Sequence, residues 1–288
     1  PNQLIPWGAL SGMVGDNNNA QTLYAVPDSY YAQSRIFRAE VAPKGPAIIK
    51  QAIVLSKDGS TVDYDLEGIA QRQDGSFWLV SEGNSGSRPN LLIKAAADGS
   101  VMEEISLPAS VVAKQISNGF EGVAVTGSGE QEKVYIAFQR EWKGDPAGMV
   151  RIGVYTPSTN SWGFLYYPIE STDTGWIGLS ELSAIDEHNF AVIERDNQQG
   201  DRARVKRLYR FSVADLTPAA EGETFPQVSK SLAYDLLPEL QATHGWVLDK
   251  VEGTAIAKNG EVYVVTDNDG VDDASGETRF MKLGKLFK

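Results

Sequence analysis

The sequence predicts an all-β fold, a β-propeller of five blades with four antiparallel strands in each blade. The first observation is a repeat. Five strand-like segments share one pattern, at residues 10–14, 66–70, 120–124, 179–183 and 251–255. The second residues of successive segments are separated by 56, 54, 59 and 72 positions. Strands and turns repeated with a period of this size are typical of propellers. The second observation is what occupies those positions, namely Ser11, Glu67, Glu121, Ser180 and Glu252. Six blades are the alternative if one group of strands is misread.

Each of these segments is followed by a short turn rich in Asn, Asp and Gly, and then by further strands. Second strands, rich in aromatic and β-branched residues, are expected at 23–26, 77–80, 134–138, 190–193 and 262–266. Third strands are expected at 35–41, 91–95, 151–155, 206–211 and 279–283, and fourth strands at 48–55, 101–107, 163–169 and 229–234. The last repeat lacks a fourth strand of its own, so residues 2–5 are expected to supply it and close the ring.

Composition limits the function. The net charge of −12 disfavours a nucleic-acid partner or an anionic membrane surface, because both need clustered Lys and Arg. The chain has no cysteine, which excludes disulfides, thiol catalysis and thiolate metal sites. No apolar stretch reaches 18 residues, so we expect no membrane span. Because the repeat runs from end to end, we expect one propeller domain over residues 1–288, and a monomer.

The second positions of the repeats predict a metal site. The first strand of every blade lines the central channel of a propeller, so three carboxylates and two hydroxyls are expected to meet around one axis. Crowded carboxylates repel each other and lose hydration, which raises their pKa values unless a cation is present. Oxygen ligands without His or Cys favour calcium or magnesium, and an irregular cage favours calcium over magnesium. The alternative is that each Glu only caps a turn at the mouth of its blade.

A second ring of polar residues is expected just outside the first. Alignment of the second strands on their aromatic residue places Asp28, Glu82, Gln139, Glu194 and Asp267 at equivalent positions. The four acids are candidate catalytic residues, because carboxylates beside a metal can orient or deprotonate a water. Candidates for holding an anionic substrate such as a phosphate ester are Arg88, Arg140, Arg195 and Asn268. The alternative is that all of these are solvated loop charges or salt bridges between blades.

Several segments resemble a known family. Residues 65–70, 118–124, 192–195 and 251–253, followed by 266–268, are similar to the phytase-like family, which is described by an esterase-like activity of phytase. The resemblance covers essentially the whole chain. The order Ser, Glu, Glu, Ser, Glu around the ring also resembles five-bladed calcium-dependent apyrases, and this implies that the five ring residues face a calcium ion. Gln139 departs from the pattern, since it stands where a carboxylate would complete the outer ring.

These observations predict a calcium-dependent hydrolase that acts on phosphoesters or related esters at the mouth of the channel. Metal-bound water is the expected nucleophile, because the chain has no Gly-x-Ser-x-Gly elbow and only two His residues. Two alternatives stay open: a non-catalytic, calcium-stabilised propeller that binds a protein or glycan, and a lactonase-like hydrolase. Calcium is abundant outside the cytosol, so a periplasmic or secreted protein is expected. The acidic run 267–273 lacks EF-hand spacing, which favours an ordinary turn over a second calcium loop.

Overall fold

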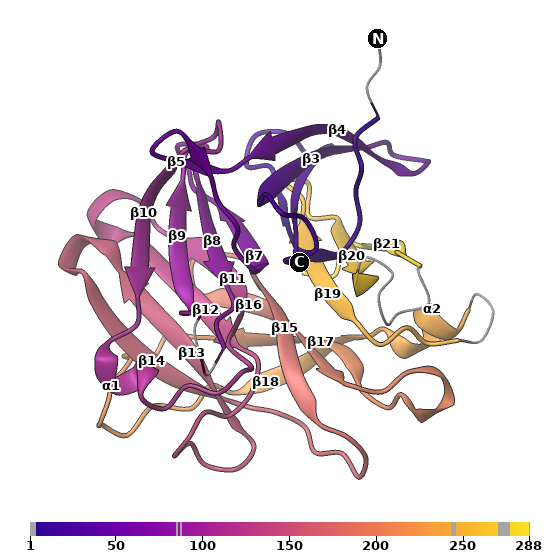
Figure 1. Ribbon diagram of the computed structural model, residues 1–288. Coiled ribbons are helices and arrows are strands. Elements are labelled where there is room, and N and C mark those ends of the chain that lie inside the picture. The colour runs from indigo at the N-terminus through magenta and orange to yellow at the C-terminus, as the bar shows by residue number, and fades with distance from the viewer. Residues whose placement is uncertain (1–3, 85, 87, 243–245, 270–276, 288) are drawn as a thin grey trace.

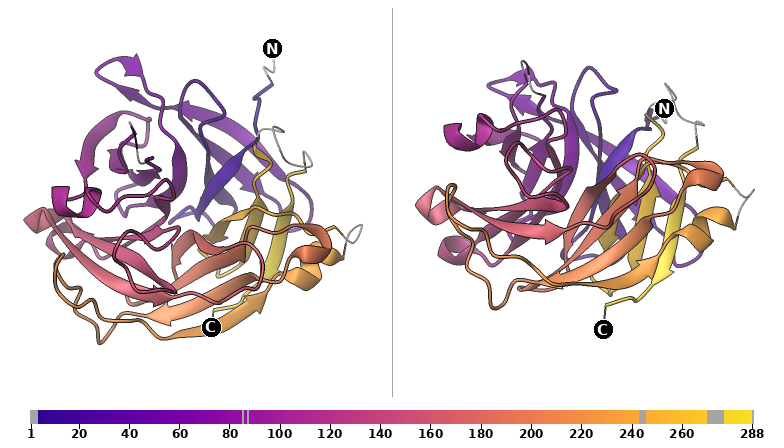
Figure 2. Two further views of the ribbon diagram at one scale, coloured as in Figure 1. Left: turned by 60° about the horizontal axis from the view of Figure 1, so that its bottom comes forward. Right: turned by 90° about the horizontal axis from the view of Figure 1, so that it is seen from below.

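The computed structural model describes residues 4–84, 86, 88–242, 246–269 and 277–287. Its sheets are arranged radially around one axis (Figures 1 and 2). Four of them have four antiparallel strands, and the sheet β19–β20–β21 has three. The fold is therefore the predicted five-bladed propeller, and it is almost free of helix. No helix within the described ranges is long and apolar enough to cross a membrane.

The strands follow the predicted order. Blade 1 contains β1 (Leu10–Gly15), β2 (Thr22–Pro27), β3 (Arg35–Val41) and β4 (Ala47–Val54). Blade 2 contains β7 (Leu66–Gln71), β8 (Phe77–Ser81), β9 (Leu91–Ala95) and β10 (Val101–Ser106). Blade 3 contains β11 (Phe120–Thr126), β12 (Lys133–Phe138), β13 (Met149–Thr156) and β14 (Ser161–Pro168). Blade 4 contains β15 (Ile177–Ala184), β16 (Asn189–Asp196), β17 (Lys206–Ser212) and β18 (Lys230–Asp235).

Blade 5 contains β19 (Val251–Ile256), β20 (Val262–Thr266) and β21 (Phe280–Gly284). The remaining elements are short: the hairpin β5 (Ser56–Lys57) and β6 (Ser60–Thr61), the helices α1 (Ala109–Val112) and α2 (Leu237–Gln241), and 3-10 turns at Gly129–Gln131, Pro157–Thr159 and Gly200–Arg202.

The ring closes by contact between first strands. Each first strand packs against the first strand of the next blade, and β19 packs against β1, so the first and last blades of the chain lie side by side (Figure 1). The closing strand expected at residues 2–5 is not formed in the described part of that segment, since Leu4 and Ile5 belong to no strand. Asn2 and Gln3 lie outside the described residues. Leu4 is 91% exposed, so it contributes little to the seam between blades 1 and 5.

The hydrophobic core lies between the blades. Aromatic residues of the second strands pack across two of the gaps: the rings of Tyr24 and Phe77 lie 4.9 Å apart, and those of Tyr135 and Phe190 lie 4.4 Å apart. Edge-to-face and tilted contacts of this kind add to the area that large rings bury. The buried Trp78 also donates from Nε1 to Glu132 Oε1 at 2.9 Å, which satisfies its polar atom. This packing makes a rigid frame for the side chains at the axis.

Candidate metal centre

A β-bulge occurs at the same place in every first strand. The pairing between first and second strands shifts between Leu10 and Gly12, Leu66 and Gly68, Phe120 and Val123, Leu179 and Glu181, and Val251 and Gly253. In each case the shifted segment contains the residue expected in the inner ring, which is Ser11, Glu67, Glu121, Ser180 or Glu252. A bulge adds a residue that the ladder leaves unpaired and re-aims its side chain. The fold thereby presents one polar side chain from each blade at the axis.

Glycines follow the ring residue in four of the five blades and let the first strands approach closely. A Cβ atom added to Gly68 would lie 2.6 Å from the carbonyl oxygen of Glu121, and one added to Gly12 would lie 2.7 Å from the Cα of Gly68. Such distances leave no room for a side chain. Glycine is therefore required here by the approach of neighbouring backbones, and its conformational freedom is a secondary matter.

Three ring carboxylates gather at the axis. Glu67, Glu121 and Glu252 each offer an oxygen, and these oxygens lie within 4.8 Å of one another. Glu121 and Glu252 are buried, and Glu67 is partly buried. Burial raises the pKa of Glu67 and of Glu121 well above its usual value, and the charges of the neighbouring carboxylates raise it further. Such a cluster is unfavourable unless protons or a cation neutralise it.

Unpaired oxygens make this cluster suitable for a hard cation. Within the described residues, Ser11 Oγ and Glu121 Oε2 are buried and have no hydrogen-bond partner. Unsatisfied buried oxygens are costly, and a bound ion is one way of satisfying them. The donor set consists of oxygens alone, which suits calcium or magnesium. The residues therefore fit the cation that the sequence predicts.

The other two ring residues are already engaged. Ser180 Oγ accepts a hydrogen bond from Arg195 Nε at 2.8 Å, and Glu252 Oε1 accepts one from Arg195 Nη2 at 2.5 Å. Arg195 is 3% exposed, and its Nη1 lies 3.4 Å from Asp249 Oδ1. Its guanidinium is thus held by three acceptors. Arg195 is therefore buried against two inner-ring residues, and its expected contact with a substrate stays a prediction.

Strand register makes Arg195, and not Glu194, the outer-ring residue of blade 4. In the other blades the aligned aromatic residue pairs with the residue three positions beyond the ring residue, as Trp78 does with Ala70. In blade 4, Phe190 pairs with Ala184, four positions beyond Ser180. The aromatic alignment is therefore displaced by one residue. The equivalent outer positions are Asp28, Glu82, Gln139, Arg195 and Asp267.

Glu194 lies away from the axis, in the packing between blades 3 and 4. Its Oε2 accepts hydrogen bonds from Lys230 Nζ at 2.7 Å and from the Tyr167 hydroxyl at 3.0 Å, and its Oε1 accepts one from the backbone N–H of Glu170. The side chain is fully buried. This environment is that of a structural ion pair, and nothing in it brings Glu194 to the mouth of the channel.

Gln139 and Glu82 support the ring from outside. Gln139 Nε2 donates to Glu121 Oε1, and Asn118 Nδ2 donates in turn to Gln139 Oε1, which fixes the orientation of the amide. Glu82 Oε1 accepts from the backbone N–H of Gly119 at 2.7 Å, next to β11. Glu82 also groups with Glu67 and Asp65 within 4.8 Å. Burial, with the charge of Asp65, raises the pKa of Glu82 to about 8.

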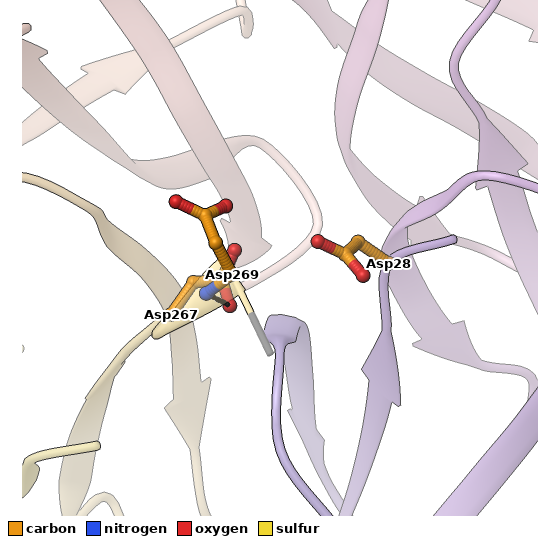
Figure 3. A group of neighbouring side chains, drawn as sticks. All are labelled: Asp28, Asp267 and Asp269. Atoms are coloured by element: carbon orange, nitrogen blue, oxygen red, sulfur yellow. Dashed lines mark hydrogen bonds between the residues drawn. The ribbon is translucent and has the colours of Figure 1, made fainter. Parts of the chain in front are cut away.

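A further acidic group lies where blades 1 and 5 meet. Figure 3 shows Asp28 pointing from the end of β2 toward Asp267 and Asp269. Asp267 Oδ1 accepts from the backbone N–H of Asp269 at 2.9 Å, and Asp269 pairs with Lys250. Burial raises the pKa of Asp28 to about 6, while burial and the charge of Glu252 raise that of Asp267 to about 8. Of the acidic run 267–273, only residues 267–269 lie in the described part of the chain.

The remaining predicted substrate contacts differ in availability. Arg88 Nη1 pairs with Asp65 Oδ2 at 2.8 Å. Asn268 Oδ1 accepts from the backbone N–H of Ala9 at 2.7 Å and so joins the two ends of the ring. Arg140 Nε is buried and makes no hydrogen bond with any described residue, although Glu141 Oε2 lies 3.7 Å away. The Arg140 guanidinium lies 4.8 Å from the ring centroid of Trp176, and the Arg195 guanidinium lies 5.6 Å from the same centroid.

Two charged residues near the axis were not predicted. Glu181 occupies the position that glycine takes in the other blades, and its carboxylate accepts from the backbone N–H groups of Met13 at 3.0 Å and Leu182 at 2.9 Å. It is 1% exposed, and burial raises its pKa well above the usual value. Lys250 precedes β19; burial alone would lower its pKa, but the nearby Glu252 and Asp269 raise it. The sequence signal for Glu181 was the missing glycine of the fourth repeat.

Fold and site together define a five-bladed propeller with an oxygen-lined centre suited to a hard cation. The profile of the Phytase-like family, described as "esterase-like activity of phytase", matches residues 5–270. The chain therefore belongs to this family. A comparison with curated proteins found no match.

Several solved structures show weak similarity to this chain. The allergen Mala s 1 of Malassezia sympodialis is 14% identical, with 96% of this chain and 77% of that one covered and a TM-score of 0.46. The PQQ-bound aldose sugar dehydrogenase of Streptomyces coelicolor is 17% identical, with 96% and 79% covered and a TM-score of 0.43. The Niastella koreensis GH74 enzyme is 13% identical, with 90% and 34% covered and a TM-score of 0.44. None of these similarities supports an argument about activity.

Proposed function

We propose that this protein is a divalent-cation-dependent hydrolase of phosphoesters or related esters, with calcium as the cation and the mouth of the propeller channel as the site. The observation that carries the proposal is the group of Glu67, Glu121 and Glu252 at the axis, whose carboxylates each offer an oxygen within 4.8 Å of the others, together with the unpaired oxygens of Ser11 and Glu121. Membership of the Phytase-like family supports ester hydrolysis as the reaction class.

Different residues of the chain would bind the substrate and transfer protons beside the cation. When bound, a divalent cation polarises a substrate oxygen and makes a coordinated water more acidic. Arg140 is the residue best placed to bind an anionic substrate. Its buried Nε has no hydrogen bond among the described residues, and its side chain is 27% exposed. Glu82 and Asp267 stand at outer positions from which a carboxyl group could exchange a proton with a substrate or water.

Calcium is preferred to magnesium for two reasons. Magnesium demands near-octahedral geometry and gives up its waters reluctantly, whereas calcium accepts irregular sets of oxygens. The ligands here come from separate blades, with spacing set by backbone packing. Weak calcium sites are filled where calcium is plentiful, so we place the protein outside the cytosol, in a periplasm or secreted, with a small anionic ester as its substrate.

The test is a hydrolysis screen on the purified chain, with phosphomonoesters, phosphodiesters, nitrophenyl carboxylates and lactones, in calcium and in chelator. We expect release of phosphate or nitrophenol in calcium, its loss in chelator, and its loss in Glu121→Gln at matched folding. Glu132→Gln is the control, because Glu132 is equally buried but pairs with Arg72 away from the axis. Turnover that chelator does not affect would refute the proposal.

The same screen separates the alternatives. A propeller with a structural calcium would lose thermal stability in chelator and turn over no substrate. A lactonase-like hydrolase would open the lactones and leave the phosphoesters intact.

A further inference from the structure

The ring is divided into two parts by the hydrogen bonds of its residues. Ser11, Glu67 and Glu121 come from blades 1, 2 and 3, and two of them carry a buried oxygen with no partner among the described residues. Ser180 and Glu252 come from blades 4 and 5, and both accept hydrogen bonds from Arg195. Five positions that the sequence treats as equivalent are therefore unequal in the folded chain.

Arg195 is the source of this asymmetry. It stands at the outer position that carries Asp28, Glu82, Gln139 or Asp267 in the other blades. Its guanidinium is buried and reaches Ser180, Glu252 and Asp249, so it cannot turn toward a ligand without taking its charge away from the buried Glu252 carboxylate. Arginine keeps its charge in such surroundings and binds carboxylates in fixed geometry.

We propose that Arg195 is a built-in counter-ion of the ring: it holds Ser180 and Glu252, so that a divalent cation is bound by Ser11, Glu67 and Glu121 on the side of blades 1 to 3. This inference rests on the proposed cation site and refines its ligand set. Arg195 acts as a positioning residue, because it works through Glu252 and Ser180 and touches neither cation nor substrate.

The physical reason is charge. A guanidinium 2.5 Å from Glu252 cancels much of the attraction that this carboxylate has for a second cation. The same positive charge, beside a cluster whose oxygens lie within 4.8 Å of each other, also weakens binding of a cation by the other two carboxylates. Removal of Arg195 should therefore strengthen cation binding, the reverse of what is expected for a substrate-binding arginine.

The experiment measures calcium affinity by calorimetry on chelator-treated, full-length protein. We compare the wild type with Arg195→Met and with the double variant Arg195→Met/Glu252→Gln. We expect Arg195→Met to bind calcium at least about tenfold more tightly, because a buried positive charge is gone. The double variant, which loses one charge of each sign, should stay within about threefold of the wild type, because Glu252 is not needed as a ligand.

Arg151→Met is the matched control. Arg151 is 1% exposed and pairs with Asp145 at 2.7 Å and Glu221 at 2.8 Å in the outer part of blade 3. Its loss should lower the melting temperature and leave the calcium affinity unchanged. The control separates a general effect of losing a buried arginine from an effect on the ring.

The outcomes are distinct. If the wild type binds no divalent cation, the proposed function fails and this inference fails with it. If the wild type binds calcium and Arg195→Met binds it equally or more weakly, only the inference is overturned. A loss of about 100-fold or more in the double variant would identify Glu252 as a ligand and also overturn it. Should Arg195→Met not fold, the double variant decides, because it contains no unpaired charge.

Discussion

The stability of the chelated protein should fall as the pH rises from about 5 to 8, which is unusual for a protein rich in ion pairs. Glu82 has a pKa of about 8 in the folded chain, against 4.5 as its ordinary value. The folded state then holds a proton that the unfolded state has lost, so each pH unit inside this window costs the folded state up to about 1.4 kcal/mol. Glu82 alone therefore lowers the free energy of unfolding by about 3 kcal/mol between pH 5 and 8.

Urea unfolding in chelator at pH 5, 6, 7 and 8 measures this slope, and the same series in excess calcium tests the cation. We expect calcium to restore most stability at pH 8 and little at pH 5, since protons compete for the same oxygens. Glu82→Gln should reduce the slope in chelator, while Glu132→Gln should not. Acids with lowered pKa, such as Asp16 and Asp74, act below this window. Stability in chelator that is constant or rising between pH 5 and 8 would refute the reasoning.

Three other predictions concern single residues. Gly68→Ala should destabilise the fold by at least about 2 kcal/mol in urea unfolding and abolish calcium binding, because the new Cβ would lie 2.6 Å from the Glu121 carbonyl oxygen. Glu194→Ala should cost about 2–3 kcal/mol, because the buried Tyr167 hydroxyl loses its acceptor and Lys230 loses its nearer carboxylate while keeping Glu170 at 3.5 Å, yet calorimetry should find calcium affinity unchanged; a weakened affinity would place Glu194 in the site after all. Arg140→Ala should raise KM for anionic esters about tenfold or more without changing KM for neutral esters, and equal effects on both would exclude an anion contact.

Much of the fold and of the inner ring could be predicted from the sequence, because a repeat fixes equivalent positions whatever their detailed geometry. The bulge that aims Glu67 or Glu121 at the axis recurs with the repeat, so the prediction did not need to foresee it. The outer ring was harder. Alignment on aromatic residues assumes that first and second strands pair in the same register in all blades. In blade 4, however, Phe190 pairs with Ala184, which is one position further along the first strand than the partner of the aromatic residue in the other blades.

This shift of one residue in blade 4 puts Arg195, and not Glu194, at the outer-ring position. The charge there is therefore positive, where the sequence predicted a negative one. The partners of the charged side chains could not be predicted from the sequence either. The pairing of Glu194 with Lys230 joins residues 36 apart, and that of Arg195 with Glu252 joins residues 57 apart, so neither follows from local pattern. The role of Glu181 does not follow from the repeat, because Ser180 takes the ring position of blade 4 and glycine takes the place of Glu181 in the other four blades.

The carboxylate of Glu181 has a consequence for how the chain reaches its final form. Its hydrogen bond to the backbone of Met13 spans 168 residues, and it joins blade 4 to the first blade of the chain. Such distant partners must find each other before the centre is sealed, and contacts of large sequence separation slow folding. A nascent chain that ends before blade 4 leaves the backbone N–H of Met13 without this acceptor. Until residue 181 of the 288 has been synthesised, the incomplete ring lacks this contact and exposes its interior edges to aggregation.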